Sequence, residues 1–349
     1  MWTSTAARRF SLAALLPPVL MTLLTAGVSV WLEKVTGDLT RVGRWAEHDY
    51  GFRAAQADIR VLPNLDAWTG SQVLVIGDSF AQGNLWQSEL ARHSGRHFLT
   101  WHFDQVRCVQ PWLAQLARQH PRAIAKVIFE TVERAAIRRG NEALDCPRPA
   151  SIGPPLPLAS GMTTQERSYW PLTMDPAYVF PSALHAVQQR IHPTATLSDA
   201  AFSAPLTRAD LFSSRASDRL LFLRSDIDAW QESGQAAADA ATHFLRLRDT
   251  LAAQGIALQV LVVPDKSTAY RSVIQTSTLP TQRVDLAALL RQQGIDAPDL
   301  RSAFAREALR TQDFYLPNDS HLSHRGFIFL AQFLARHDLE TASGAALRP

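Results

Sequence analysis

Short aliphatic runs alternate with helical apolar patterns in the central part of the chain. The aliphatic runs occupy residues 73–76, 97–103 and 126–132, and amphipathic helical patterns lie between them at 84–93 and 111–120. Aliphatic runs of this length, bounded by turn residues, are typical of strands that are buried in a parallel sheet. The resulting β-α-β-α-β order predicts an α/β domain with a parallel sheet and right-handed crossovers.

This alternation is interrupted between about residues 140 and 228. Residues 146–181 are rich in proline, serine and glycine and show no sustained period. We interpret these residues, together with the segment that follows as far as about residue 223, as an insertion over the sheet edge. This insertion could act as a substrate lid. Regular structure is predicted again from about residue 229, with a helix that ends at Gly255, a strand at 256–263 and helices at 285–293, 301–309 and 324–337.

The N-terminal region contains a long apolar segment. Residues 10–32 carry no charged side chain, and a helix of this length can cross the ~30 Å hydrocarbon core of a membrane. A secretory signal has a shorter apolar region, roughly 7–15 residues, with small residues at its cleavage site. Because the segment continues to Leu32 without such a site, we favour an uncleaved anchor. Arg8 and Arg9 precede it, so the positive-inside rule places the rest of the chain in the periplasm.

These patterns predict a linear order of parts. We expect a cytoplasmic tail at 1–9, an inner-membrane anchor at 10–32, a stem at 33–69, a globular domain at 70–340 with its insertion at about 140–228, and a flexible tail at 341–349.

Composition limits the classes of function. The chain has 349 residues, of which 46% are hydrophobic and 19% charged, so it can form a full core. Its formal net charge of +3 and the lack of a basic run do not indicate nucleic-acid binding. The sequence has no zinc-ligand spacing, P-loop or dinucleotide fingerprint, so we expect no metal and no cofactor. Cys108 and Cys146 could pair in an oxidising compartment or remain as separate thiols.

Two short polar segments carry candidate chemistry. Gly-Asp-Ser-Phe at 77–80 follows the first strand, at the sheet edge where ligands of open α/β sheets gather. The second segment, just before the last helix, contains Asp319 and His321. An imidazole can take the proton of Ser79, and a carboxylate two residues away can fix the imidazole tautomer. Ser79 alone could be a helix N-cap and the second segment a polar turn, but their combination favours catalysis.

The two segments together resemble the SGNH (GDSL-type) hydrolase superfamily over residues 70–340. Further segments resemble its alginate O-acetyltransferase (AlgJ/AlgX-like) branch, namely Gly-Phe-Arg at 51–53, Phe-Glu-Thr-Val-Glu-Arg at 129–134, and Val-Pro-Asp-Lys at 263–266 with Tyr270. The Asp-x-His spacing also fits this branch. The resemblance implies a flavodoxin-like three-layer α/β/α fold and acetylation of an exopolysaccharide on the periplasmic side of the membrane.

This chain differs from the AlgJ/AlgX-like pattern at three points. Its Asp-x-His motif follows the serine segment instead of preceding it, Leu322 stands where a tryptophan is common, and Glu133 and Arg134 occupy the place of the superfamily's Gly-x-Asn-Asp block. Besides the Ser79 N–H, Arg134 is therefore a candidate oxyanion donor. A salt bridge from Arg134 to Glu130 or Glu133 is an equal alternative.

Three other side chains are candidates for contact with substrate. Asp78 adjoins the nucleophile, and Lys266 and Tyr270 follow a strand, so both could lie at the carboxyl edge of the sheet. A tyrosine there could stack on a sugar ring. The alternative for the last two is an ordinary loop lysine and a core tyrosine.

The leading functional hypothesis is an O-acetyltransferase that forms an acetyl-serine and passes the acetyl group to a polysaccharide. Its expected partners are the polysaccharide acceptor and a membrane-bound acyl-donor protein. A carbohydrate or lipid acetylesterase shares the covalent step and differs only in using water as the acceptor. A non-catalytic subunit of a polysaccharide-export complex is the alternative outside enzymes, and the presence of Ser79, Asp319 and His321 argues against it.

Overall fold

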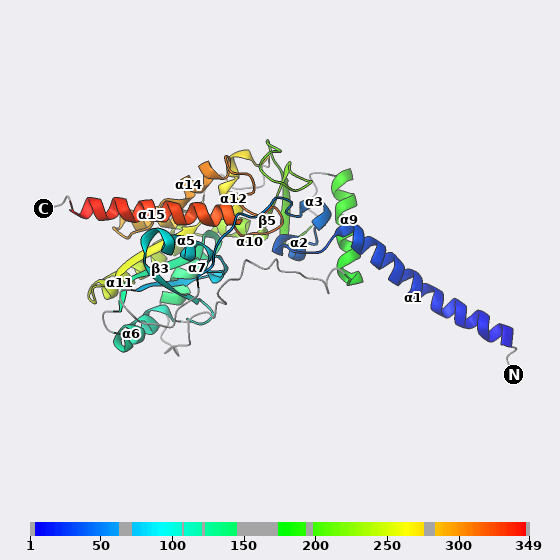
Figure 1. The fold of residues 1–349 in the computed structure, drawn as a ribbon, viewed down its shortest axis with the longest axis horizontal. Coiled ribbons are helices and arrows are strands. Elements are labelled where there is room, and N and C mark those ends of the chain that lie inside the picture. The colour runs from blue at the N-terminus through cyan, green and yellow to red at the C-terminus, as the bar shows by residue number, and fades with distance from the viewer. Residues whose placement is uncertain are drawn as a thin grey trace. The chain divides into compact units, whose positions relative to one another are not determined.

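The computed structural model describes residues 4–62, 72–106, 108–120, 123–144, 174–192, 198–275 and 283–346. The chain forms two compact units, each assembled from separate stretches (Figure 1). Unit 1 comprises residues 1–53, 166–223 and 317–320, and unit 2 comprises residues 54–165, 224–316 and 321–349.

Unit 2 is built around a parallel sheet of four strands. These are β1 (Gln72–Gly77), β2 (His97–His102), β3 (Ile124–Val132) and β6 (Ala257–Val263), in the order β2-β1-β3-β6. Each strand coincides within two residues with an aliphatic run identified in the sequence, and the predicted α/β class is confirmed. The strands are buried almost throughout because helices cover both faces of the sheet.

One face of the sheet packs on α6 (Val109–Gln119), α7 (Glu133–Leu144), α11 (Gly234–Ala252) and α13 (Leu286–Gln292). Alternate strand residues such as Leu74, Val127 and Val260 form this core. On the other face, α15 (His324–Ala346) lies beside α5 (Leu85–Ser94). An ion pair of 2.8 Å between Lys126 Nζ and Asp338 Oδ1 ties α15 to β3. The remaining elements of unit 2 are α4 (Ser79–Gln82), α10 (Arg224–Asp228), η1 (Ala229–Gln231), α12 (Lys266–Ala269), η2 (Arg271–Val273) and α14 (Leu300–Glu307).

The strand order places a switch point between β1 and β3. The chain leaves β1 toward β2 on one side and then returns past β1 to form β3 on the other side. Ligands in open α/β sheets bind outside the carboxyl ends of the strands at such a point. Ser79 follows β1 and Glu133 follows β3, so both lie at this edge of the sheet.

Unit 1 contains α1 (Ser4–Leu32), α2 (Asp38–Gly43), α3 (Glu47–Tyr50) and α9 (Pro176–Ile191), together with the antiparallel pair β4 (Ala201–Pro205) and β5 (Arg219–Leu223). The segment expected to be a stem therefore contains two short helices, and much of the expected insertion packs with them. Trp45, Ala201 and Leu221 share one small core there.

The first helix has the length and composition of a membrane span. Within α1, residues Arg9–Leu32 are apolar enough to cross a bilayer, with a mean hydropathy of 1.8. Cys108 is disulfide-bonded. The sequence left open whether Cys108 pairs with Cys146, and Cys146 lies outside the described residues.

Candidate active site

Ser79 lies at the turn between β1 and α4. Asp78 caps this short helix, because its Oδ1 accepts a hydrogen bond of 3.0 Å from the Phe80 N–H. Gly77 is required by close packing. A Cβ at that position would lie 2.5 Å from Glu130 Oε2 and 2.6 Å from the Ala81 Cβ. The glycine therefore lets the strand turn tightly and present the half-buried Ser79 at the switch point.

The structure brings Ser79 and His321 together within unit 2. The Ser79 Oγ lies 2.7 Å from His321 Nε2, which is the distance needed for an imidazole to take a serine proton during attack. The Phe80 ring packs against the imidazole with a centroid distance of 4.8 Å and restricts its orientation. These two residues are the pair that the sequence assigned as nucleophile and base.

Asp319 belongs to unit 1, two residues along the chain from His321. Its Oδ2 accepts a hydrogen bond of 2.9 Å from the backbone N–H of Asp38. The neighbouring Ser320 N–H donates to Asp38 Oδ1 at 2.7 Å. The backbone oxygen of Asn318 accepts from the Leu39 N–H at 3.1 Å. The start of α2 therefore fixes the loop at 317–320.

Glu47 organises the same loop from inside unit 1. Its Oε1 accepts from the backbone N–H groups of Thr36 at 2.6 Å and Gly37 at 2.8 Å, and its Oε2 accepts from Asn318 Nδ2 at 3.0 Å. Burial raises the pKa of Glu47, and these hydrogen bonds oppose the rise. No local sequence signal marked this glutamate, because its role depends on a segment about 270 positions later.

A buried pair of carboxyl groups supports the turn at Ser79. Asp78 Oδ2 accepts from the Val132 N–H at 2.8 Å and pairs with Arg139, and Glu130 Oε2 accepts from the Asp78 N–H at 3.0 Å. Burial and then the charge of Asp78 raise the pKa of Glu130 well above its usual value. Burial also opposes ionisation of Asp78, but Arg139 and the two backbone donors outweigh it and lower its pKa. Asp78 is thus the charged member and Glu130 the protonated one.

A cavity of about 310 Å³ opens beside Ser79, and arginine is its most frequent lining residue. Three arginines of α7 contribute to it, beside a single carboxylate. This set of side chains suits an anion or a developing oxyanion and does not suit Ca²⁺ or Mg²⁺, which prefer oxygen ligands. The lining residues are Asp78, Ser79, His102, Val132, Arg134, Ala135, Arg138, Arg139 and Ser225.

The three arginines differ in how firmly they are held. Arg134 forms ion pairs with Asp265 at 2.7 Å and Asp226 at 3.6 Å, instead of with the glutamates considered from the sequence. Arg139 is paired with Asp78 and also donates to Thr131 Oγ1 at 2.9 Å. Arg138 is more than half exposed and pairs with Glu142 on the helix surface. Sequence reasoning identified Arg134 but missed the other two, which the helical turn of α7 brings to the same cavity.

Lys266 and Tyr270 occupy the core instead of the cavity. The Lys266 Nζ donates to the Leu316 backbone oxygen at 2.6 Å, and the Tyr270 hydroxyl accepts from the Tyr315 N–H at 3.4 Å. Their exposed fractions are 2% and 0%, so the expectation that they reach a sugar does not agree with the structure. They support the segment that leads into the His321 loop.

Comparison with known proteins identifies a family over part of the chain. Residues 214–348 match the family model described as the SGNH hydrolase-like domain of acetyltransferase AlgX. The match includes Asp319 and His321 and begins after Ser79 in the chain. It confirms the resemblance to the SGNH superfamily and its AlgX-like branch. No curated protein and no solved structure matches the chain.

Proposed function

We propose that this protein is a serine O-acetyltransferase that acts on an exported bacterial polysaccharide, with α1 anchored in the inner membrane and the rest of the chain in the periplasm. The observation that carries the proposal is the 2.7 Å contact between Ser79 Oγ and His321 Nε2 at the switch point of the sheet. The family match over residues 214–348 supports acyl-ester chemistry on a polysaccharide. The apolar residues Arg9–Leu32 support the anchor.

The first half-reaction forms an acetyl-serine. Ser79 Oγ attacks the carbonyl carbon of an acetyl ester while His321 Nε2 takes the hydroxyl proton. The tetrahedral oxyanion is stabilised by the Ser79 N–H and by the positive charge of the cavity arginines. As the ester C–O bond breaks, the imidazolium gives its proton to the departing alcohol. Asp319 orients the imidazole, as the resemblance implies.

The second half-reaction returns the serine to its free state. A sugar hydroxyl enters, gives its proton to His321 and attacks the acetyl carbonyl, and the proton then passes to the Ser79 oxygen as the ester bond breaks. Water in place of the sugar would give an acetylesterase, the second candidate, with the same residues. The contact between Ser79 and His321 argues against a purely structural subunit, which needs no base beside a serine. A membrane-bound protein remains our proposed source of the acetyl group.

The acetyl-serine can be tested by intact mass spectrometry. We would incubate the full-length protein with a chromogenic acetyl ester and measure both turnover and mass. Ser79→Ala and His321→Ala should each lower turnover by several orders of magnitude, and the double variant should be no worse, because the pair acts as a unit. Asp319→Ala should cost somewhat less. Ser94→Ala, at an exposed serine of α5, is the matched control and should behave as wild type.

The two enzymatic candidates separate when a polysaccharide acceptor is added. A transferase should convert the acetyl-enzyme to acetylated polymer, whereas an esterase should release acetate at an unchanged rate. Wild-type turnover in Ser79→Ala would contradict both.

A further inference from the structure

Helix α9 has one buried face and one exposed face, and both are apolar. Its buried face includes Tyr178, Val179 and Ala186. The opposite face carries Leu184 and Ile191, which are 54% and 64% exposed. Val187 lies on the same side and is 48% exposed. The spacing i, i+3, i+7 places these three side chains along one stripe, where a surface helix of a soluble protein would carry polar residues.

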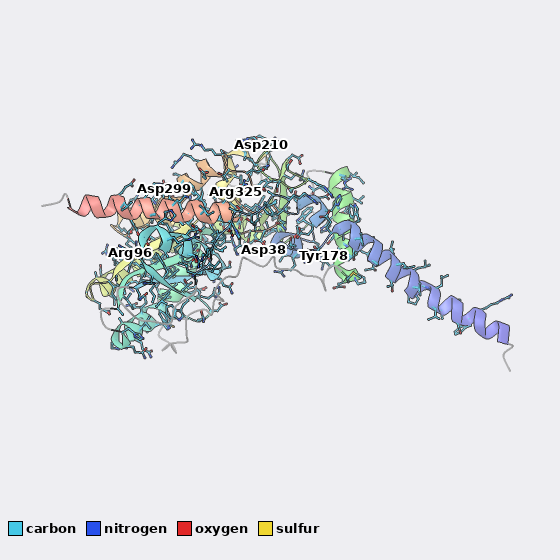
Figure 2. The ribbon with its side chains drawn as sticks, in the orientation of Figure 1. Asp38, Arg96, Tyr178, Asp210, Asp299 and Arg325 are labelled. Carbon is cyan, nitrogen blue, oxygen red and sulfur yellow. The ribbon has the colours of Figure 1, made fainter. Side chains whose placement is uncertain are left out.

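The buried face of α9 packs on the end of α1. Val28, Trp31 and Leu32, in the last two turns of α1, form a small core with Tyr178 and its neighbours on α9. In Figure 1, α9 crosses α1 at that end of the helix, and Figure 2 labels Tyr178 there. The two helices belong to the same unit, so the position of α9 relative to the apolar span is part of the fold.

The length of α1 determines the level in a bilayer at which this contact with α9 would lie. A helix rises ~1.5 Å per residue, so ~20 residues cross a hydrocarbon core of ~30 Å. Counted from Arg9, where the apolar span begins, that distance ends in the turns that hold Val28 and Trp31. Tryptophan is enriched at this level of a membrane protein. The helix that packs there, α9, must then lie at the membrane surface.

An arginine side chain lies at the same level as Trp31. The Arg190 guanidinium of α9 lies 5.5 Å from the centroid of the Trp31 ring and also pairs with Asp49 at 3.3 Å. Arginine over an interfacial tryptophan suits the phosphate region of a bilayer, where both charged and aromatic groups are stable.

We infer that α9 is an interfacial helix whose stripe of Leu184, Val187 and Ile191 inserts into the lipid surface next to α1. The inference rests on the proposed anchoring by α1. Lipid is the occupant that the structure favours, because the stripe belongs to a helix packed on the apolar span itself. A helix whose exposed apolar stripe enters the lipid surface holds the domain close to the bilayer.

Site-specific photocrosslinking in membranes tests this inference on the full chain. A benzophenone amino acid would replace Leu184, and irradiation should give lipid adducts detectable by mass spectrometry. The same substitution at Leu20, exposed in the middle of α1, is the positive control. Asp210 is the negative control, because it lies in the same unit on the side away from α1 in Figure 2.

The controls distinguish failure of this inference from failure of the proposed anchoring. Lipid adducts at Leu20 and Leu184 but not at Asp210 would support an interfacial α9. Adducts at Leu20 combined with a protein crosslink at Leu184, to another protein or within the chain, would overturn it. A lack of lipid adducts at Leu20 would overturn the anchor and the inference with it. Purified protein in liposomes should give the same result at Leu184, since no other protein is present there.

Discussion

Two buried carboxyl groups, Asp78 and Glu130, hold the turn that carries Ser79 in place. Glu130 has an exposed fraction of 0%. One of its carboxyl oxygens accepts a hydrogen bond from the N–H of Asp78, the residue before Ser79. A buried charge without a close partner is costly, so the protonated form of this acid is favoured. A neutral side chain of the same shape should therefore serve as well as the acid.

Glu130→Gln and Glu130→Leu should separate shape from hydrogen bonding. The glutamine keeps an acceptor for the Asp78 N–H, so the free energy of unfolding at pH 7 and the ester turnover should both stay near wild type. The leucine leaves that N–H buried without an acceptor, which should cost about 1–3 kcal/mol. It should also lower turnover by releasing the turn that carries Ser79. Urea unfolding and ester hydrolysis measure both, and equal losses in the two variants would contradict a protonated Glu130.

The raised pKa of Asp226 predicts that the stability of the protein depends on pH. Burial and then the charge of Asp265 raise its pKa to about 8, and the charge of Arg134 opposes the rise. Because the folded pKa exceeds the unfolded one, the contribution to stability is complete below about pH 4 and is lost as the pH rises through 8. Asp226→Asn removes this loss. Relative to wild type, its free energy of unfolding should rise between pH 5 and pH 8, by at most about 1.4 kcal/mol per pH unit, and then level off.

The matched control for this titration is Asp228→Asn, at an exposed carboxylate two residues away. Its difference from wild type should be flat over the same range. If the Asp226→Asn difference is flat as well, Asp226 is ionised in the folded protein at all these pH values.

The proximity of Ser79 and His321 could be predicted from the sequence, but the rest of the cavity could not. Ser79 and His321 stand in short motifs at the ends of secondary-structure elements. The fold brings the two side chains into contact although 242 positions separate them in the chain. Arg138 and Arg139 lie in a helix that the sequence did not predict, so their convergence on Ser79 carried no local signal. Lys266 and Tyr270 were placed at the correct edge of the sheet but are turned into the core.

At the scale of elements, the position of the loop at 317–320 depends on α2, which lies far away in the chain. Gly37 precedes α2 in an extended conformation, with φ of −91°, so an alanine meets no backbone strain there. Space is the limit, because an added Cβ would lie 2.0 Å from the Asn318 backbone oxygen. The loop at 317–320 can approach α2 only while residue 37 lacks a side chain.

Gly37→Ala should therefore displace the loop that carries Asp319. We expect turnover to fall by about 10- to 100-fold, since a shift of ~1 Å in a catalytic group has effects of this size. The free energy of unfolding should fall by about 1–3 kcal/mol. Gly234→Ala, where an added Cβ meets nothing within 4 Å, is the matched control and should change neither. Wild-type turnover in Gly37→Ala would mean that the loop position does not matter for catalysis.

The elements that the sequence predicted correctly are those with a clear apolar pattern. The four strands are continuous aliphatic runs buried on both faces. Helix α9 was missed because Pro176 and Pro181 interrupt its sequence and because its exposed stripe is apolar. A helix without a polar face gives no amphipathic signal. The same property that hid α9 from the sequence supports the place at the membrane surface that we propose for it.

At the scale of the whole molecule, the site requires both ends of the chain. The matched SGNH-like part, residues 214–348, supplies His321 and Asp319, whereas Ser79 comes from a strand before it. The stretches that form each unit also alternate along the sequence, so neither unit is a continuous piece of chain. Neither half of the sequence can therefore contain the proposed acyl-transfer site alone.

The proposed orientation of the whole chain in the membrane follows from charges at one end of α1. Arg8 and Arg9 precede the apolar span, and basic residues stay on the cytoplasmic side. A reporter enzyme that is active only outside the cytoplasm, fused after Pro349, should therefore be active, and one that is active only inside should not. Replacing both arginines with glutamate should lower the active fraction of the first reporter, because the charge bias that sets the orientation is removed. Deletion of residues 1–32 should abolish its activity. Strong activity of the cytoplasmic reporter on the unaltered chain would place Ser79 on the wrong side of the membrane for an exported polysaccharide and would contradict the proposed function.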